Sequence, residues 1–443
     1  MKTARISRRQ FLQQSTATGA LLLSITPARA AAAAEKPTWV STDGPNQPTG
    51  TGKGIFPGRV AWDYEPGAAL WNSRGAWWSD PNNNQAVIDG MFSKTIRCVA
   101  GQNQDREAWN RLFHSFNKRR GKADAGYVLG EKIAIKINEN NTASHADTDE
   151  INASPQMVLA LLKQLVNEAG VPQPNITLFD ASRFITDNVY RKCQSQFPDV
   201  VFVDNPGGDG RVKATYKADA IRYSMDCRLA KGLATCLVEA NYVIDFAILK
   251  GHVGQGVTLC AKNFYGATSI ASDWHKNAHD YFEAKRDGSP SYMAFADFLG
   301  HKDMGGKTLL FVIDALYGCK VVNGQPGPRW NMPPFNGRWP SSLFVSEDGV
   351  ALDSVALDFF RSEWPEGQDL AYADAYLHEA ALANHPPSGA VYDPERDGTG
   401  CGSLGVHEHW NNPIAKAYSR NLGKAAGIEL VAVHEKTGKQ NSA

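Results

Sequence analysis

Lys250, His252 and Lys262 stand in one short stretch, K-G-H-V-G-Q-G-V-T-L-C-A-K-N-F-Y-G at 250–266, which follows the apolar run A-N-Y-V-I-D-F-A-I-L. Ammonium groups bind anions, and an imidazole transfers protons because its pKa lies near neutral pH. We therefore predict these three residues as the catalytic residues of a site for a small anionic substrate. The alternative for each residue alone is a polar side chain satisfied by hydrogen bonds within the protein.

Amide, hydroxyl and cationic side chains in this stretch and after earlier strands are predicted to bind the substrate. Glycines at 251, 254 and 256 would let the backbone approach a ligand and offer N–H donors, as phosphate-binding loops do. The signature G-x-x-x-x-G-K-[ST] is absent, so carboxylate, phosphate and sulfate all stay open as the anion. The predicted binding residues are Lys136, Asn138, Arg183, Gln255, Thr258 and Asn263.

The 7 cysteines of the chain indicate neither a cluster nor a nucleophile. None forms C-x-x-C, and no four have the spacing of a cluster or zinc motif, so an iron–sulfur cofactor is not expected. Cys260 has no recognisable base beside it and stands between apolar residues, which favours a buried thiol over a nucleophile. Cys227 and Cys236 are close enough in sequence for a disulfide in an oxidising compartment.

Metal-ligating residue types are scattered along the chain and leave a divalent metal ion open as a cofactor. His275 and His279, in W-H-K-N-A-H-D, are four residues apart and share a face if that segment is helical, although H-E-x-x-H is absent. Asp180 and Asp314 follow or end predicted strands and are the carboxylates assigned with them. The acidic run at 145–149 and the H-E-H run at 407–409 are alternatives, and each of these groups alone also fits a solvated surface.

The segments that must position these residues read as strands alternating with helices. This order predicts an α/β fold: an open, mostly parallel sheet with crossover helices, an N-terminal Trp-rich arm and a helical or loop-rich C-terminal extension. Ligands bind at the carboxyl ends of parallel strands, and six predicted strands end in charged or amide residues, so we expect one shared polar edge. The predicted strands are 130–138, 175–182, 199–205, 240–249, 308–318 and the start of 341–360; the helices between them include 154–170 and 187–197.

Residues 1–30 read as a twin-arginine export signal rather than as part of the fold. S-R-R-Q-F-L at 7–12, an apolar segment and A-R-A at 28–30 give the signal and its cleavage site. We therefore expect a periplasmic protein that meets the twin-arginine machinery. The whole chain has a formal net charge of zero, and residues 1–30 hold five basic and no acidic residues. The exported chain would thus be slightly acidic, which argues against a nucleic-acid partner, and no later run is long enough to span a membrane.

The domain division expected from composition has four parts. Residues 1–30 are the signal, 31–129 the arm and its helices, 130–363 the α/β core, and 364–443 an extension that packs on the core. Four tryptophans of W-D-Y-E-P-G-A-A-L-W-N-S-R-G-A-W-W would either line a sugar or aromatic ligand or pack as an arm, and packing is favoured.

Three segments together resemble the domain-of-unknown-function family 362. They are K-I-A-I-K-I-N-E-N with its following helix P-Q-M-V-L-A-L-L-K-Q-L-V-N-E-A-G, the stretch I-L-K-G-H-V-G-Q-G-V-T-L-C-A-K-N-F-Y-G, and D-G-V-A-L-D-S-V-A-L-D. The likeness covers roughly 130–363 and implies an α/β fold, but no agreed activity. Some relatives append ferredoxin-type cysteines, which this chain lacks. The positions carried over are Lys136, Asn138, Lys250, His252, Thr258, Lys262, Asn263, Asp353 and Asp358.

The function that these residues predict is an enzyme acting on a small anionic substrate, such as a sugar acid or another carboxylate. His252 would assist acid–base chemistry, with or without a metal ion, and lyase, isomerase and hydrolase reactions all stay open. One alternative is a periplasmic ligand- or metal-binding carrier without catalysis, and another is a redox protein. The sequence does not indicate an oligomeric state.

Overall fold

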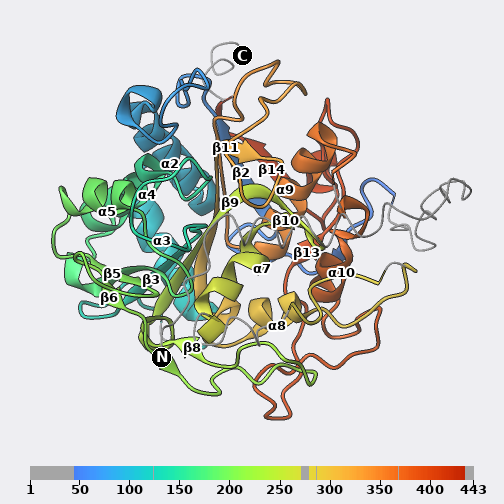
Figure 1. The fold of residues 1–443 in the computed structure, drawn as a ribbon. Helices are drawn as coiled ribbons and strands as arrows, with labels where there is room; N and C mark the ends of the chain where they lie inside the picture. Colours follow the sequence, from blue (N-terminus) through green and yellow to red (C-terminus); the bar gives the residue numbers. More distant parts are fainter. Residues whose placement is uncertain (1–43, 123, 271–278, 286, 368, 435–443) are drawn as a thin grey trace, which may run out of the picture. The chain divides into compact units, whose positions relative to one another are not determined.

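A ten-stranded sheet runs through the part of the chain that the structure describes (Figure 1). The computed structural model describes residues 44–122, 124–270, 279–285, 287–367 and 369–434, so the predicted signal at 1–30 lies outside the described residues. The strand order is β14-β2-β12-β11-β9-β3-β4-β5-β6, and β10 pairs with β9. These strands are β2 (Arg59–Tyr64), β3 (Ile133–Ile137), β4 (Ile176–Asp180), β5 (Val201–Asp204), β6 (Val212–Lys213), β9 (Tyr242–His252), β10 (Gly256–Thr258), β11 (Thr308–Cys319), β12 (Ser342–Ser346) and β14 (Glu429–Ala432).

The consecutive strands from β11 to β6 are parallel, which confirms the predicted open, mostly parallel sheet with crossover helices. β12 and β2 add antiparallel pairs at one side, and β14 lies parallel to β2. Small pairs form outside this sheet, from β1 (Thr49–Gly50) with β13 (Val406–His407) and from β7 (Tyr216–Lys217) with β8 (Leu233–Ala234).

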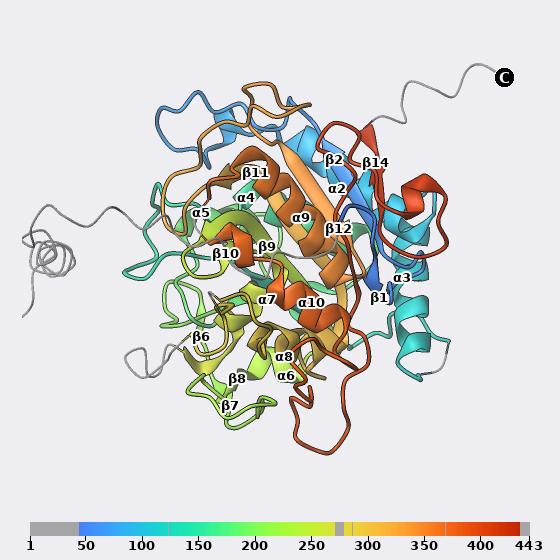
Figure 2. The same cartoon turned by 90° about the vertical axis from the view of Figure 1, so that its right-hand side faces the viewer.

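Helices cover both faces of the sheet (Figures 1 and 2). On one face lie α2 (Gln85–Ala100), α3 (Asp105–Arg119), α4 (Pro155–Lys163) and α5 (Asp187–Gln194). On the other lie α7 (Cys260–Asn263), α8 (Ala294–Gly300), α9 (Gly349–Glu363) and α10 (Ala375–Ala381); α6 (Thr235–Glu239) precedes β9. Short 3-10 turns are η1 (Asp80–Asn82), η3 (Gln173–Asn175), η4 (Phe264–Ala267), η6 (Gly305–Lys307), η7 (Leu370–Tyr372) and η8 (Arg420–Leu422), while η2 (Gln164–Glu168) is a π-turn that continues α4.

The period-two pattern of β3 decides which face each residue joins. Ile133 and Ile135 are buried in the hydrophobic cluster of α2 to α5, whereas Ala134 belongs to the cluster of α7 to α10. Successive side chains of a strand point to opposite faces, so Lys136 lies on the same face as Ala134. Because Lys136 points to this face, its ammonium group reaches Asn263 of α7.

One predicted strand end lies away from the expected polar edge. β12 runs antiparallel to β11, so residues after it reach the opposite edge of the sheet from the ends of the parallel strands. There Glu347 accepts a hydrogen bond from the Ile55 N–H (2.7 Å), and Asp348 accepts one from the Lys53 N–H (2.8 Å). The prediction of six strand ends at one edge was therefore wrong for this strand, because strand direction is not encoded in a local pattern.

The tryptophan-bearing segment packs into the interior. Trp62 lies on β2, and Trp71 and Trp77 are 3% and 1% exposed. Trp71 stacks on Trp339 with ring centroids 5.4 Å apart. No described helix is both long and apolar enough to cross a membrane.

Candidate anion site at the strand ends

The order of the parallel strands creates a switch point between β3 and β9. From β3 the chain proceeds to β4 and then β5 on one side, whereas β9 and β11 lie on the other side. The crossover connections on the two sides therefore lead away from each other, and the crevice between them is where open α/β sheets bind ligands. Lys136 near the end of β3 and Lys250 near the end of β9 both belong to this crevice.

Four buried residues form what we call the inner group: Lys136, Asp180, Asp245 and Asn263. The Lys136 ammonium group donates to Asp180 Oδ2 (3.1 Å), to Asn263 Oδ1 (3.0 Å) and to the Ile137 carbonyl. Asn263 Nδ2 donates to Asp245 Oδ1 (2.6 Å) and to the Lys136 carbonyl (3.1 Å). The three ammonium protons of Lys136 thus all have acceptors, whereas Asp245 Oδ2 is buried without a partner among the described residues.

Glycine is required where the chain passes over this group. A Cβ atom at Gly266 would lie 2.9 Å from Lys136 Nζ and 3.1 Å from Asp180 Oδ1. The α7 backbone that carries Asn263 is fixed from the other side by Asp353 of α9, which accepts hydrogen bonds from the N–H groups of Cys260 (2.9 Å) and Ala261 (3.0 Å). Asn263 is therefore held by its backbone as well as by its side chain.

Lys250 lies deeper than its sequence position at a strand end suggests. It is 2% exposed and donates to Asn140 Oδ1 and to the Val322 carbonyl (3.1 Å). Burial, assisted by the charge of Arg183, lowers the pKa of Lys250 to about 7. A neutral amine can make both of these donations and still keep its lone pair.

The glycine-rich stretch forms a β-hairpin. β9 continues through Gly251 to His252 and turns into β10, with Thr258 opposite Lys250. Gly254 (φ 81°) and Gly256 (φ 78°) supply the left-handed conformations that the tight turn needs. On this hairpin Gln255 and Thr258 are buried, and none of their side-chain polar atoms has a hydrogen-bond partner among the described residues.

Lys262 differs from Lys136 and Lys250 in having no oxygen acceptor within the described chain. Its ammonium group faces the rings of Tyr265 (4.7 Å to the centroid) and Phe282 (5.0 Å). Desolvation lowers the pKa of Lys262 well below its usual value, and the charges of Lys250 and Arg183 lower it further. We call Lys262, His252, Gln255 and Thr258 the outer group.

His252 is neutral in this setting. Desolvation, together with the charge of Lys262, lowers the pKa of the imidazole to about 2. His252 Nδ1 lies 2.7 Å from the Val253 carbonyl, so Nδ1 carries the proton and Nε2 is the acceptor. The His279 ring lies 6.0 Å from that of His252, and burial lowers the pKa of His279 to about 4.

A comparison with protein families assigns this chain to a described family. A family model described as a domain of unknown function, DUF362, matches residues 133–358, slightly more than half of the 443 residues. The chain belongs to the DUF362 family. The match confirms the resemblance seen in the sequence. A search of curated proteins finds no match.

The metal ligands predicted for this DUF362 chain do not form one group among the described residues. Asp180 is engaged by Lys136, and Asp314 accepts hydrogen bonds from the N–H groups of Ser154 (2.8 Å), at the start of α4, and Leu316 (3.0 Å). His279 lies among aromatic rings, and His275 falls outside the described residues. Asp314 thus has a plain structural task as an acceptor for backbone N–H groups.

Sequence reasoning missed two acidic residues of the candidate anion site. Glu139 directly follows Asn138, and both its carboxylate oxygens are buried without a partner among the described residues. Burial, reinforced by the charge of Asp180, raises the pKa of Glu139 well above its usual value. Burial likewise raises the pKa of Asp245 well above its usual value. The run N-E-N-N after the strand was the only available signal for Glu139, and Asp245 was hidden inside an apolar strand.

The structure also tests the two predictions made for cysteine residues. Cys260 is fully buried, and desolvation raises its pKa well above its usual value, which confirms a packed thiol. Cys227 and Cys236 are free, so the predicted disulfide was wrong, and none of the seven cysteines forms one in the described chain.

Proposed function

We propose that this chain is a periplasmic enzyme that binds a small anionic substrate, such as a sugar acid or another carboxylate, at the outer group. The observation that carries the proposal is Lys262, a desolvated ammonium group whose charged neighbours Lys250, Arg183 and Lys136 are all cations. A partly buried, desolvated cation without a counter-ion is unfavourable, and a bound carboxylate would supply the missing charge.

Binding of an anion would also change the protonation of the site. The charges of Lys262 and Lys250 contribute to the low pKa of His252, after the larger effect of desolvation. A carboxylate that offsets these charges raises the pKa of His252 and makes Nε2 a stronger base. The site would thus become competent for proton abstraction when the substrate is present.

A base and a neutral acid are the pair that elimination or isomerisation of a hydroxy acid requires. His252 Nε2 is the proposed base. Glu139, whose raised pKa keeps it protonated, is the proposed proton donor. The unpartnered side chains of Gln255 and Thr258 would bind hydroxyl groups of the substrate, which satisfies polar groups that are otherwise buried alone.

The periplasmic location rests on the signal at residues 1–30. Replacing Arg8 and Arg9 together by lysine is expected to keep the precursor in the cytoplasm, as measured by cell fractionation and immunoblotting. Export of the doubly substituted chain at the normal level would contradict the twin-arginine route.

The enzymatic part is tested with sugar acids and small hydroxy acids offered to purified protein, with products followed by NMR. We expect turnover of at least one compound, and His252→Gln should lower kcat by about 100-fold or more while leaving KM within a few-fold. An exposed histidine variant, His385→Gln, serves as the matched control. Binding without turnover, unaffected by His252→Gln, would instead establish a carrier.

A further inference from the structure

A second polar cluster lies between α10 and β13, on elements that do not form the anion site. Asp374, His378 and His407 each offer a ligand atom, and these three atoms lie within 4.8 Å of one another. The three residues are 1%, 5% and 0% exposed. It is the only group of three or more such donors within the described residues, and we call it the α10–β13 cluster.

Two atoms of the cluster are left without hydrogen bonds. Asp374 Oδ1 and His407 Nε2 are both buried and have no partner among the described residues. A buried polar atom without a partner costs about 1–3 kcal/mol, so two such atoms on residues of one cluster require an explanation.

Neighbouring groups fix the tautomer of His407 so that its lone pair faces the cluster. Ser354 Oγ donates its proton to the Val350 carbonyl (2.7 Å), so this hydroxyl accepts from His407 Nδ1 at 2.8 Å. The proton of the neutral imidazole is therefore on Nδ1, and Nε2 carries the unshared electron pair. A hydrogen bond on the far nitrogen is how proteins orient metal-binding histidines.

His378 and Asp374 are oriented in the same manner. His378 Nδ1 lies 3.0 Å from the Asp374 carbonyl, a contact that orients the imidazole. Asp374 Oδ2 lies 3.4 Å from His409 Nε2 and 3.5 Å from Arg361, and His409 is itself anchored by Asp358 (2.8 Å). These contacts hold one carboxylate oxygen and leave Oδ1 for a ligand.

The sequence explains why the three donors meet. Asp374 and His378 are four residues apart at the start of α10, in D-A-Y-L-H, and so occupy one face of the helix. His407 comes from β13, which pairs with β1 so that His407 lies opposite Thr49. The rings of His378 and His407 are 4.5 Å apart between centroids.

We propose that the α10–β13 cluster binds a divalent transition-metal ion of the Zn²⁺ type, with one atom each of Asp374, His378 and His407 as ligands. Two imidazoles and one carboxylate are a donor set that zinc accepts, and three protein ligands leave a coordination position for water or substrate. Ligands about 2.1 Å from a tetrahedral ion lie about 3.4 Å apart, so binding draws the three atoms together.

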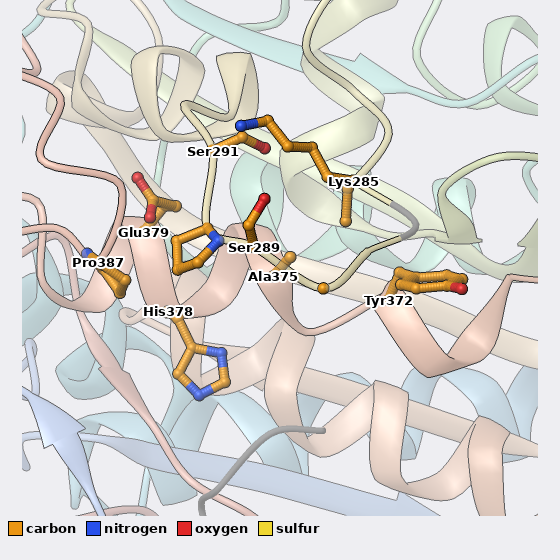
Figure 3. A pocket seen from close by; sticks show the side chains of 11 residues that line it. Lys285, Ser289, Ser291, Tyr372, Ala375, His378, Glu379 and Pro387 are labelled. Atoms are coloured by element: carbon orange, nitrogen blue, oxygen red, sulfur yellow. The ribbon is translucent and has the colours of Figure 1, made fainter. Parts of the chain in front are cut away.

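His378 also connects this cluster with a surface pocket. Figure 3 shows the pocket, with Lys285, Ser289 and Ser291 on one side and residues of α10 on the other. The His378 imidazole belongs to the lining but is directed away from Ser291 and Lys285 in that view. The His378 side chain would therefore separate the metal from the pocket.

The test uses the full exported chain, freed of metal with a chelator and titrated with Zn²⁺ alone. We expect one Zn²⁺ per chain, and Asp374→Asn and His407→Gln should each weaken its affinity by about 100-fold or more. Ser354→Ala, which removes only the acceptor behind His407, should weaken it by about 10–100-fold. His385→Gln, an exposed imidazole outside the cluster, should leave it unchanged.

Titration with Co²⁺ gives a second readout, because cobalt bound by nitrogen and oxygen donors at a low-coordinate site absorbs visible light. We expect absorption with the wild type and its loss in Asp374→Asn, while circular dichroism of the metal-free variant stays native. Equal Zn²⁺ affinity of wild type and Asp374→Asn, or no tight Zn²⁺ binding by the wild type, would overturn the proposal. Lys262→Met should bind Zn²⁺ normally, so this result is independent of the anion site.

Discussion

The inner and outer groups of the anion site meet at α7, which carries Asn263 of the inner group and Lys262 of the outer group, yet they are built differently. In the inner group every proton of the Lys136 ammonium has an acceptor, and Asn263 joins Lys136 to Asp245. In the outer group Lys262 contacts only rings, and Gln255 and Thr258 have no hydrogen-bond partners among the described residues.

This difference separates polar residues that hold the fold from polar residues that await a ligand. Both groups carry lysines that sequence reasoning assigned to the same site. The Lys136 ammonium group is already paired with Asp180 and needs no further counter-ion. The Lys262 ammonium group has no such partner and would be stabilised by a bound anion. The lysine type and the strand-end position were common to both, and only the partners tell them apart.

The largest expected effect is that of breaking the inner group. Lys136→Met leaves Asp180 buried without its counter-ion, and we expect the free energy of unfolding to fall by about 3–5 kcal/mol. Urea unfolding measures this loss, with the exposed Lys302→Met as the matched control. A loss below about 1 kcal/mol would show that Lys136 and Asp180 are not a structural pair.

The matching substitution in the outer group should behave in the opposite way. Lys262→Met removes a desolvated charge that has no acceptor, so without ligand the free energy of unfolding should stay within about 1 kcal/mol of the wild type or increase. The same urea series measures it. A loss as large as that of Lys136→Met would place Lys262 in the structural framework instead.

Lys250 should make stability depend on pH above neutrality. Its pKa is about 7 in the folded chain and 10.5 in the unfolded chain, so between these values the unfolded state holds more protons. Stability from this group therefore rises as pH increases through 7, by at most about 1.4 kcal/mol per pH unit. Unfolding at pH 7, 8 and 9 should show this slope in the wild type and its loss in Lys250→Met; equal slopes would contradict the assignment.

The smallest effect is expected for Cys260. Cys260→Ala keeps the backbone N–H group from which Asp353 accepts a hydrogen bond, so anion binding and turnover should remain within two-fold of the wild type. Cys260 should also resist iodoacetamide in the folded protein, as measured by mass spectrometry, because it is buried and its pKa is raised. Loss of turnover in the variant would restore the thiol as a nucleophile.

The sequence predicted β3, β4, β5, β9 and β11 because each is an apolar run followed by polar residues, but it did not predict the exposed two-residue strand β6. It also identified Lys250, His252 and Lys262 as neighbours, since all three belong to one hairpin and the helix after it. It failed for β12, whose direction depends on pairing with β11, and it did not predict that the glycines form the turn of a hairpin. Local patterns do not encode these long-range features.

The same limit explains what was missed at the two sites. Asp374 and His378 belong to the segment D-A-Y-L-H, which matches no recognisable metal-binding motif. His407 comes near them through β13, which pairs with β1 in the folded chain. Glu139 was passed over because its unusual protonation comes from burial and from Asp180, a residue on the next strand. Charge and hydrogen-bond satisfaction are properties of the folded chain.

The most direct test of the central claim is calorimetric titration of the exported protein with gluconate, galacturonate and inorganic phosphate, comparing wild type with Lys262→Met. The account predicts saturable binding of at least one anion by the wild type, and at least 30-fold weaker binding by Lys262→Met with native stability. Failure of the wild type to bind any of these anions, or equal affinity in the two proteins, would contradict it.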